Sequence, residues 1–134
     1  DDFLQKPIED ERLLAAVQSR ATRFRKLRSY MINDGLTGLL NHVASKTLLD
    51  SEVARAQRQG DPLGFAMIDL DHFKAINDSY GHPAGDRVLK SMARMLKKRL
   101  RKSDLVGRYG GEEFAIILPQ TDLKTAEALL NDVR

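Results

Sequence analysis

The sequence has no cysteine and no tryptophan. Without cysteine, the chain has no disulfide framework, no zinc–thiolate site and no cysteine nucleophile. Long apolar runs are also missing. The apolar patches present, such as FAMI and FAIIL, are far shorter than the roughly 18 to 20 residues of a membrane-spanning helix. The N-terminal DDFLQKP lacks both a starting Met and the apolar core of a signal peptide. We therefore expect part of a longer cytoplasmic protein, one that makes no membrane contact itself but whose parent could be membrane-attached through a preceding part.

Charge is more informative in its distribution than in its sum. The 22 basic and 19 acidic residues give a net charge of +3, which is too small to indicate nucleic-acid binding by itself. The stretch from Arg87 to Arg108, however, contains nine basic residues and only one acidic residue, Asp104. This stretch should attract anions, whether phosphates, nucleotides or nucleic acid.

The first 33 residues are predicted to form a linker that contains one long helix, over residues 8–33. Its apolar residues recur at alternating steps of four and three, with Arg20 interrupting the series. They are Leu13, Val17, Phe24, Leu27 and Met31. The pattern fits either an amphipathic helix lying on its own domain or a parallel coiled-coil stalk, since it holds fewer than three clean heptads. Asn33-Asp34-Gly35 breaks the pattern, and we place the domain boundary there.

The remaining residues, 34–134, predict an α/β (α+β) domain with an antiparallel-containing sheet, a hairpin at the centre of that sheet, and surrounding helices. We expect a buried central strand at 63–70, because this stretch is almost continuously apolar, and a β-hairpin of strands 105–109 and 114–118 around Gly110-Gly111. The helices are expected at 44–59, 72–78, 84–101 after Pro83, and 123–134 with Asp122 as N-cap.

Three carboxylates are the first candidates for a functional site. Asp69 ends the predicted buried strand, and Glu112-Glu113 follow the two glycines of the hairpin turn. If the hairpin pairs beside the Asp69 strand, the three carboxylates converge at one edge of the sheet. Clustered carboxylates repel one another unless a cation lies between them, and a set of oxygen ligands favours Mg²⁺ or Mn²⁺. Gly110 and Gly111 let the chain turn tightly and let a large ligand approach its backbone.

The segment after Asp69 suits a phosphorylated ligand. A helix begins near Asp71-His72-Phe73-Lys74, so free backbone N–H groups and the Lys74 ammonium point to the same place. Asn77 and Asp86 can recognise a nucleobase, because a carboxylate accepts hydrogen bonds from the N1–H and exocyclic amine of guanine. From residue types alone, however, ordinary roles in a turn and a helix cap are the favoured interpretation of these two residues.

Four motifs together carry a family resemblance. They are DGLTGLLN (34–41), IDLDHFKAIND (68–78), GHPAGD (81–86) and GRYGGEEF (107–114). In this order and at this spacing they resemble the GGDEF domain, the catalytic domain of diguanylate cyclases. The resemblance covers residues 34–134, and the family domain continues beyond them, so the domain would be incomplete at its C-terminal side.

The resemblance implies a fold like that of adenylyl cyclases and polymerase palm domains, and the condensation of two GTP into cyclic di-GMP with release of pyrophosphate. Asp69, the Leu70 carbonyl, Glu112 and Glu113 would hold Mg²⁺, and Glu112 and Glu113 would be the catalytic carboxylates. Asn77 and Asp86 would bind guanine. The phosphates would lie against His72, Phe73, Lys74, Gly110 and Gly111. Each domain would bind one GTP, so catalysis implies a homodimer, with an upstream sensor or receiver domain in the parent protein.

Arg101-Lys102-Ser103-Asp104 matches the RxxD inhibitory motif of the family at its usual distance before the glycine turn. The resemblance implies a product site in which Arg101 and Asp104 bind cyclic di-GMP. A helix C-terminus followed by an acid would explain the same residues.

Two departures and two alternatives accompany this interpretation. His42-Val43 stand where the family commonly has arginines, and the missing C-terminal part would include residues that contact the terminal phosphates of GTP. The chain could instead be a non-catalytic cyclic di-GMP receptor, although the intact acids argue against it. A nucleic-acid-binding module using the basic face near Arg87 is disfavoured, because that face lacks aromatic residues for stacking on bases.

Overall fold

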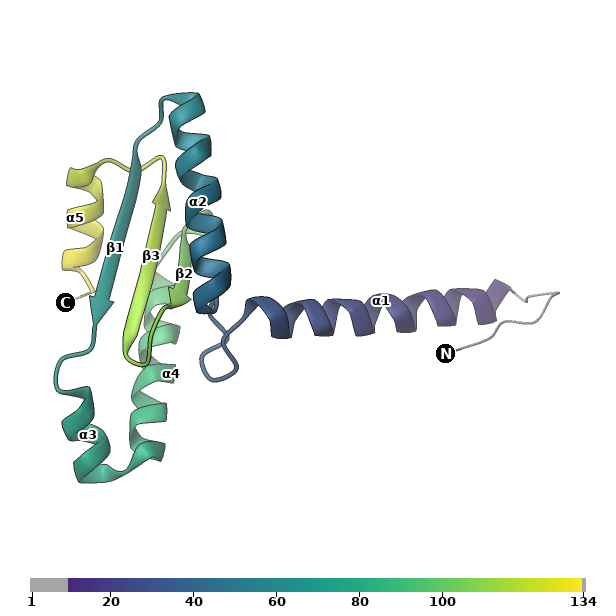
Figure 1. Ribbon diagram of the computed structural model, residues 1–134, viewed down its shortest axis with the longest axis horizontal. Helices are drawn as coiled ribbons and strands as arrows, with labels where there is room; N and C mark the ends of the chain where they lie inside the picture. Colours follow the sequence, from purple (N-terminus) through teal and green to yellow (C-terminus); the bar gives the residue numbers. More distant parts are fainter. Residues whose placement is uncertain (1–9, 134) are drawn as a thin grey trace. The chain divides into compact units, whose positions relative to one another are not determined.

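The computed structural model describes residues 10–133, which form five helices and three strands (Figure 1). In chain order they are α1 (Asp10–Ile32), α2 (His42–Gln59), β1 (Leu63–Asp69), α3 (Phe73–Tyr80), α4 (His82–Arg99), β2 (Leu105–Arg108), β3 (Glu113–Pro119) and α5 (Leu123–Asn131). The chain packs as two compact units, one ending at Ile32 and the other beginning at Asn33. No helix in the described part is long and apolar enough to cross a membrane.

The first unit is represented by α1, which is a single helix with no buried residue. Residues 8 and 9 of the predicted helix lie outside the described residues. The apolar side chains spaced by fours and threes are exposed, from 43% for Leu13 to 77% for Met31. An apolar stripe of this kind contributes nothing to a core of its own, since burial of apolar area is what stabilises a helix in water.

The second unit is built on an antiparallel sheet with strand order β1-β3-β2. The sequence therefore predicted the fold class correctly, and the central strand among residues 10–133 belongs to the hairpin that was expected at the centre of the sheet. The central strand is β3, in which every residue from Phe114 to Pro119 is buried. The strand expected to be central, β1, lies at an edge, and Phe65 and Met67 are 48% and 45% exposed.

Different helices pack on the two faces of the sheet. On one face, Phe114, Ile116 and Leu118 of β3 join a core with the buried residues of α4 and α5. On the other face α2 packs against the strands, and Ala115 and Ile117 are buried there. Residues alternate between the faces of a strand, so β3 is apolar throughout because both of its faces are covered.

Helix ends follow the expected chemistry. The Asp122 carboxylate accepts a hydrogen bond from Thr125 N at 2.8 Å, which confirms Asp122 as the N-cap of α5. The hydrogen bonds from Thr125 also lower the pKa of Asp122. Pro83 lies in the first turn of α4, as predicted, because the helix needs no N–H at that position. The Asn41 side chain caps α2 by accepting from Ala44 N at 2.9 Å.

Gly107 lets β2 pack closely against the start of α2. A Cβ at this position would collide with the Ser45 hydroxyl and would come 3.1 Å from the Leu40 carbonyl oxygen. Ser45 is itself buried, and its hydroxyl donates to Asn41 O at 2.8 Å. Neither neighbour can move without breaking a backbone contact, because Leu40 O also accepts from Arg108 N at 2.8 Å.

We predict that Gly107→Ala destabilises the second unit by about 1–3 kcal/mol, the usual cost of overpacking a tight contact. The matched control is Gly35→Ala, where the added Cβ would meet nothing within 4 Å. Urea denaturation followed by circular dichroism measures both. Equal stability of the two variants would contradict the close packing of β2 on α2.

Candidate functional site

The end of β1, the β2–β3 turn and the start of α3 lie at the same end of the sheet (Figure 1). The register places Asp69 directly opposite Glu113. The backbone continues this pairing for one more step, since Leu70 N donates to Glu112 O at 3.2 Å. The turn is closed by Tyr109 N, which donates to Glu113 O at 2.8 Å. The hairpin thus pairs beside the Asp69 strand, which meets the condition on which the carboxylates were expected to converge.

The expected convergence of three carboxylates does not occur in the described residues, where no three acidic or histidine side chains gather closely enough to hold a metal. Asp69 is exposed, while Glu112 and Glu113 are half-buried. The Glu113 carboxylate lies against Gly110, in space that a Cβ at residue 110 would fill. The strand register thus brings Asp69, Glu112 and Glu113 together at the level of the backbone.

Two side chains hold the glycine turn by its backbone carbonyls. The Arg108 guanidinium donates to Gly111 O from Nη2 at 2.9 Å and from Nε at 3.2 Å. The His42 Nδ1 donates to Tyr109 O at 2.8 Å, and the two rings lie 4.1 Å apart between centroids with a tilt of 37°. His42, which departs from the family pattern, therefore connects the start of α2 to the turn.

Asp34 links the beginning of the second unit to the same turn. Its carboxylate accepts from Arg108 Nη1 at 3.3 Å and from the backbone N–H and hydroxyl of Thr37 at 2.8 and 2.7 Å. Partial burial alone would raise the pKa of Asp34, but the hydrogen bonds from Thr37 and the charge of Arg108 outweigh it and lower the pKa. The ionised form of Asp34 is thus the one that the fold favours.

The predicted guanine-binding residues lie where α3 meets α4. The Asn77 side-chain oxygen is buried and has no hydrogen-bond partner, the one such side-chain atom found among residues 10–133. It points at Gly85, where a Cβ would collide with it. Asp86 is the next residue of α4 and is exposed. A buried acceptor without a donor is costly in a folded protein, so its persistence suggests a ligand that supplies the donor.

The three predicted phosphate-binding residues differ in accessibility. His72 precedes α3 with φ +59°, a left-handed conformation that is uncommon outside glycine and that bends the chain away from β1. Phe73 is buried and belongs to the core, so only its backbone is available to a ligand. Lys74 is exposed on the first turn of α3 and its ammonium is accessible.

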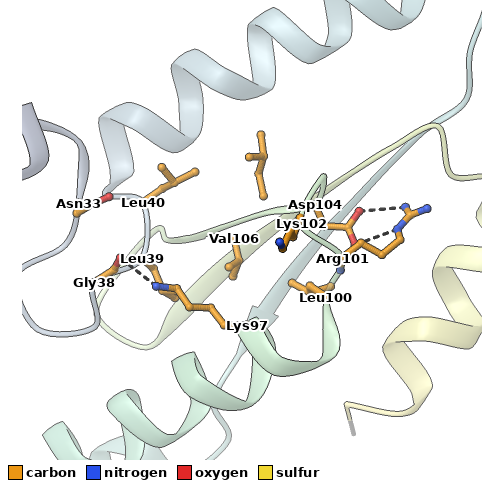
Figure 2. Close-up of a pocket in the computed structure, with 11 residues that line it drawn as sticks. Asn33, Gly38, Leu39, Leu40, Lys97, Leu100, Arg101, Lys102, Asp104 and Val106 are labelled. Atoms are coloured by element: carbon orange, nitrogen blue, oxygen red, sulfur yellow. Dashed lines mark hydrogen bonds and ion pairs between the residues drawn. The ribbon is translucent and has the colours of Figure 1, made fainter.

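The predicted product-binding residues lie at the opposite end of the hairpin. The Arg101 guanidinium pairs with Asp104 at 3.0 Å, and the Asp104 side chain has no solvent exposure. Figure 2 shows this pair beside an open cavity of about 500 Å³, with the guanidinium directed away from Val106 and Lys97. Asp104 also accepts from the Arg101 backbone N–H at 2.8 Å. In this arrangement the Asp104 carboxylate is engaged with both the side chain and the backbone of Arg101.

Three residues that support the glycine turn had no role assigned from sequence. They are Asp34, His42 and Arg108. Asp34 and Thr37 are spaced like a turn-forming pair, which is a local signal that could have been recognised. The contacts of Arg108 with Asp34 and of His42 with Tyr109 span 74 and 67 residues, and no local pattern indicates them.

Comparison with known proteins gives a consistent result. Residues 31–134 match the family described as "Diguanylate cyclase, GGDEF domain". The chain is 50% identical over 107 residues to the diguanylate cyclase DgcP of Pseudomonas aeruginosa, covering 80% of this chain and 16% of DgcP. It is 40% identical over 144 residues to the response regulator PleD of Caulobacter vibrioides, covering 100% of this chain and 32% of PleD.

Among solved structures, the coiled coil and GGDEF domain of DgcB from Caulobacter crescentus in complex with c-di-GMP superposes with a TM-score of 0.81. That match has 33% sequence identity and covers 92% of this chain and 67% of the DgcB chain. The chain spans a third or less of the length of the two curated relatives, 16% of DgcP and 32% of PleD.

We predict that Asp34→Asn lowers stability by about 1 kcal/mol near neutral pH, because it removes the charge that Arg108 and Thr37 stabilise. A lowered pKa in the folded state stabilises the protein above the unfolded pKa of about 3.9. This contribution disappears as the pH falls through the folded value, so the variant and the wild type should converge below about pH 4.

Urea midpoints measured across this pH range test the prediction, with Asp50→Asn on the exposed side of α2 as the control. A stability difference between Asp34→Asn and wild type that stays constant through the acidic range would contradict it.

Proposed function

This chain belongs to the GGDEF domain family, and we propose on that premise that its second unit condenses two GTP into cyclic di-GMP with release of two pyrophosphates. The observation that carries the proposal is the register of β1 and β3, which brings Asp69 to Glu113 beside a glycine turn held at both of its ends. Since GTP is a cytoplasmic nucleotide, the reaction implies that the domain works in the cytoplasm.

The end of the sheet has the donor chemistry of a Mg²⁺ or Mn²⁺ site. Asp69, the Leu70 carbonyl, Glu112 and Glu113 are all oxygen donors on neighbouring backbone positions. Mg²⁺ takes few protein ligands and completes its octahedron with water and phosphate oxygens, so this small set fits it. When bound, the metal would polarise the α-phosphate and favour ionisation of the attacking hydroxyl.

Glu112 is the residue we assign as acceptor of the proton from the ribose 3′-OH. Its backbone is fixed by Leu70 N, while its half-buried side chain keeps access to the site. General base catalysis needs a carboxylate within hydrogen-bond reach of the hydroxyl it deprotonates, and the turn supplies a fixed starting point for that side chain. The 3′-oxygen then attacks the α-phosphate of the second GTP, and pyrophosphate leaves.

Guanine is recognised, in this proposal, by Asn77 and Asp86. The unpartnered Asn77 oxygen accepts from the base, and Asp86 accepts from the N1–H and the exocyclic amine. Adenine has no N1–H to donate to Asp86. The phosphates lie against the backbone of His72 and Phe73 and against the Lys74 ammonium, and the glycine turn lets them approach.

Two copies must face each other, because each domain binds one GTP and the product joins two. The exposed apolar stripe of α1 supports pairing of two stalk helices, and the DgcB structure that this chain resembles comprises a coiled coil and a GGDEF domain. The likeness to PleD, a response regulator, supports a regulatory domain upstream of α1 in the parent protein. We also propose that cyclic di-GMP inhibits the enzyme by binding at Arg101.

We predict that the chain converts GTP to cyclic di-GMP in the presence of Mg²⁺, and that Glu112→Ala lowers the rate by at least about 100-fold. Chromatography and mass spectrometry of the products measure this. Glu127→Ala, which removes an exposed acid of α5, is the matched control and should retain full activity. Absence of both GTP binding and product in the wild type would overturn the proposed function.

We further predict that Gly85→Ala weakens GTP binding by about tenfold, because the added Cβ displaces the Asn77 side chain from its buried position. Gly35→Ala again serves as the control. Fluorescence titration with labelled GTP and ATP tests the prediction. If Gly85→Ala weakens both nucleotides equally, or neither, Asn77 is not a guanine-binding residue.

A further inference from the structure

The Arg101 guanidinium makes contacts with three different residues, all at the end of the hairpin that lies away from the glycine turn. Nε and Nη2 donate to the two Asp104 oxygens at 3.3 and 3.0 Å. Nη2 also donates to the Thr121 hydroxyl at 2.7 Å and to Pro119 O at 3.4 Å. Thr121 is only 4% exposed, and its hydroxyl donates to Pro119 O at 3.0 Å. The hydroxyl is therefore held in place as an acceptor for Arg101.

The guanidinium has two edges that can each donate a pair of parallel hydrogen bonds, and these contacts occupy the two edges differently. The Nε–Nη2 edge is occupied by Asp104, which is buried and also fixed by the Arg101 backbone N–H. Only the Nη1–Nη2 edge remains for a ligand, and two parallel N–H donors on that edge are what guanine O6/N7 or a phosphate would engage. The shortest contact of Nη2, however, is with Thr121. A bidentate ligand must therefore displace the Thr121 hydroxyl.

We propose that Thr121 sets the affinity of the Arg101 site for cyclic di-GMP by competing with the ligand for Nη2. The inference rests on the proposed product site and adds a residue to it, 20 positions away in the sequence. Asp104 acts as a positioning residue that holds the guanidinium in a fixed plane. Thr121 weakens ligand binding, because the hydrogen bond from Arg101 Nη2 to the Thr121 hydroxyl must break before Nη2 can donate to guanine.

Isothermal titration of cyclic di-GMP into the wild-type chain and three variants tests the proposal. Thr121→Val keeps the size of the side chain and removes the hydroxyl, so the dissociation constant should fall by about fivefold, the value of one ordinary hydrogen bond. Thr121→Ser retains the acceptor and should bind like the wild type. Arg101→Ala should lose binding. Thermal melting checks that each variant is folded, and Thr121→Ala replaces Thr121→Val if the latter is not.

A second measurement uses the wild type alone. The Thr121 amide already donates to Pro62 O at 3.2 Å, so a direct ligand contact there is not expected. Release of the Thr121 hydroxyl should nevertheless shift its amide NMR signal in step with ligand binding. A Thr121→Val affinity equal to or weaker than that of the wild type, an unmoved Thr121 signal, or no binding by any form would overturn the proposal. Product formation from GTP is measured separately, so a failure of the cyclase activity is distinguishable from this outcome.

Discussion

The pairing of β3 with both of its neighbours is the constraint on which the second unit depends. Because β3 is buried on both faces, its register cannot slip by one residue without moving apolar side chains out of two cores at once. The same register that keeps Ile116 and Ile117 on their faces also places Asp69 opposite Glu113. Packing at the centre of the sheet thus determines which residues meet at its end, and the proposed chemistry depends on that meeting.

The sequence predicted most elements to within a few residues because helical periodicity, glycine turns and capping residues are local signals. It also expected the 63–70 strand to be buried at the centre, whereas β1 is an edge strand among the described residues. The apolar run of β1 resembles a strand buried on both sides. Phe65 and Met67 lie on the same face as Ile117 and Ala115, the face on which α2 packs, yet they remain about half-exposed because β1 is an edge strand. Whether an apolar strand is covered depends on where helices pack, and periodicity carries no information about that.

The candidate site shows the same division between local and long-range signals. The motifs assigned roles to Asp69, Glu112 and Asn77, since their spacing is characteristic of the family. They did not indicate what supports the glycine turn, because the contacts of His42 with Tyr109 and of Arg108 with Asp34 join positions distant in the sequence. They also assigned Asp104 to the product site, and that assignment stays a prediction; in this structure its buried carboxylate pairs with Arg101.

The two contacts that hold the glycine turn both end on backbone carbonyl oxygens, those of Tyr109 and Gly111. Every amino acid supplies the same carbonyl, so this support does not depend on which side chains the turn carries. Mutations at the acidic positions can therefore change the chemistry of the turn while its geometry is retained. Because the support is independent of the side chains, the acidic residues of the turn can be lost or exchanged during evolution without unfolding the domain. A domain altered in this way remains available for a different function.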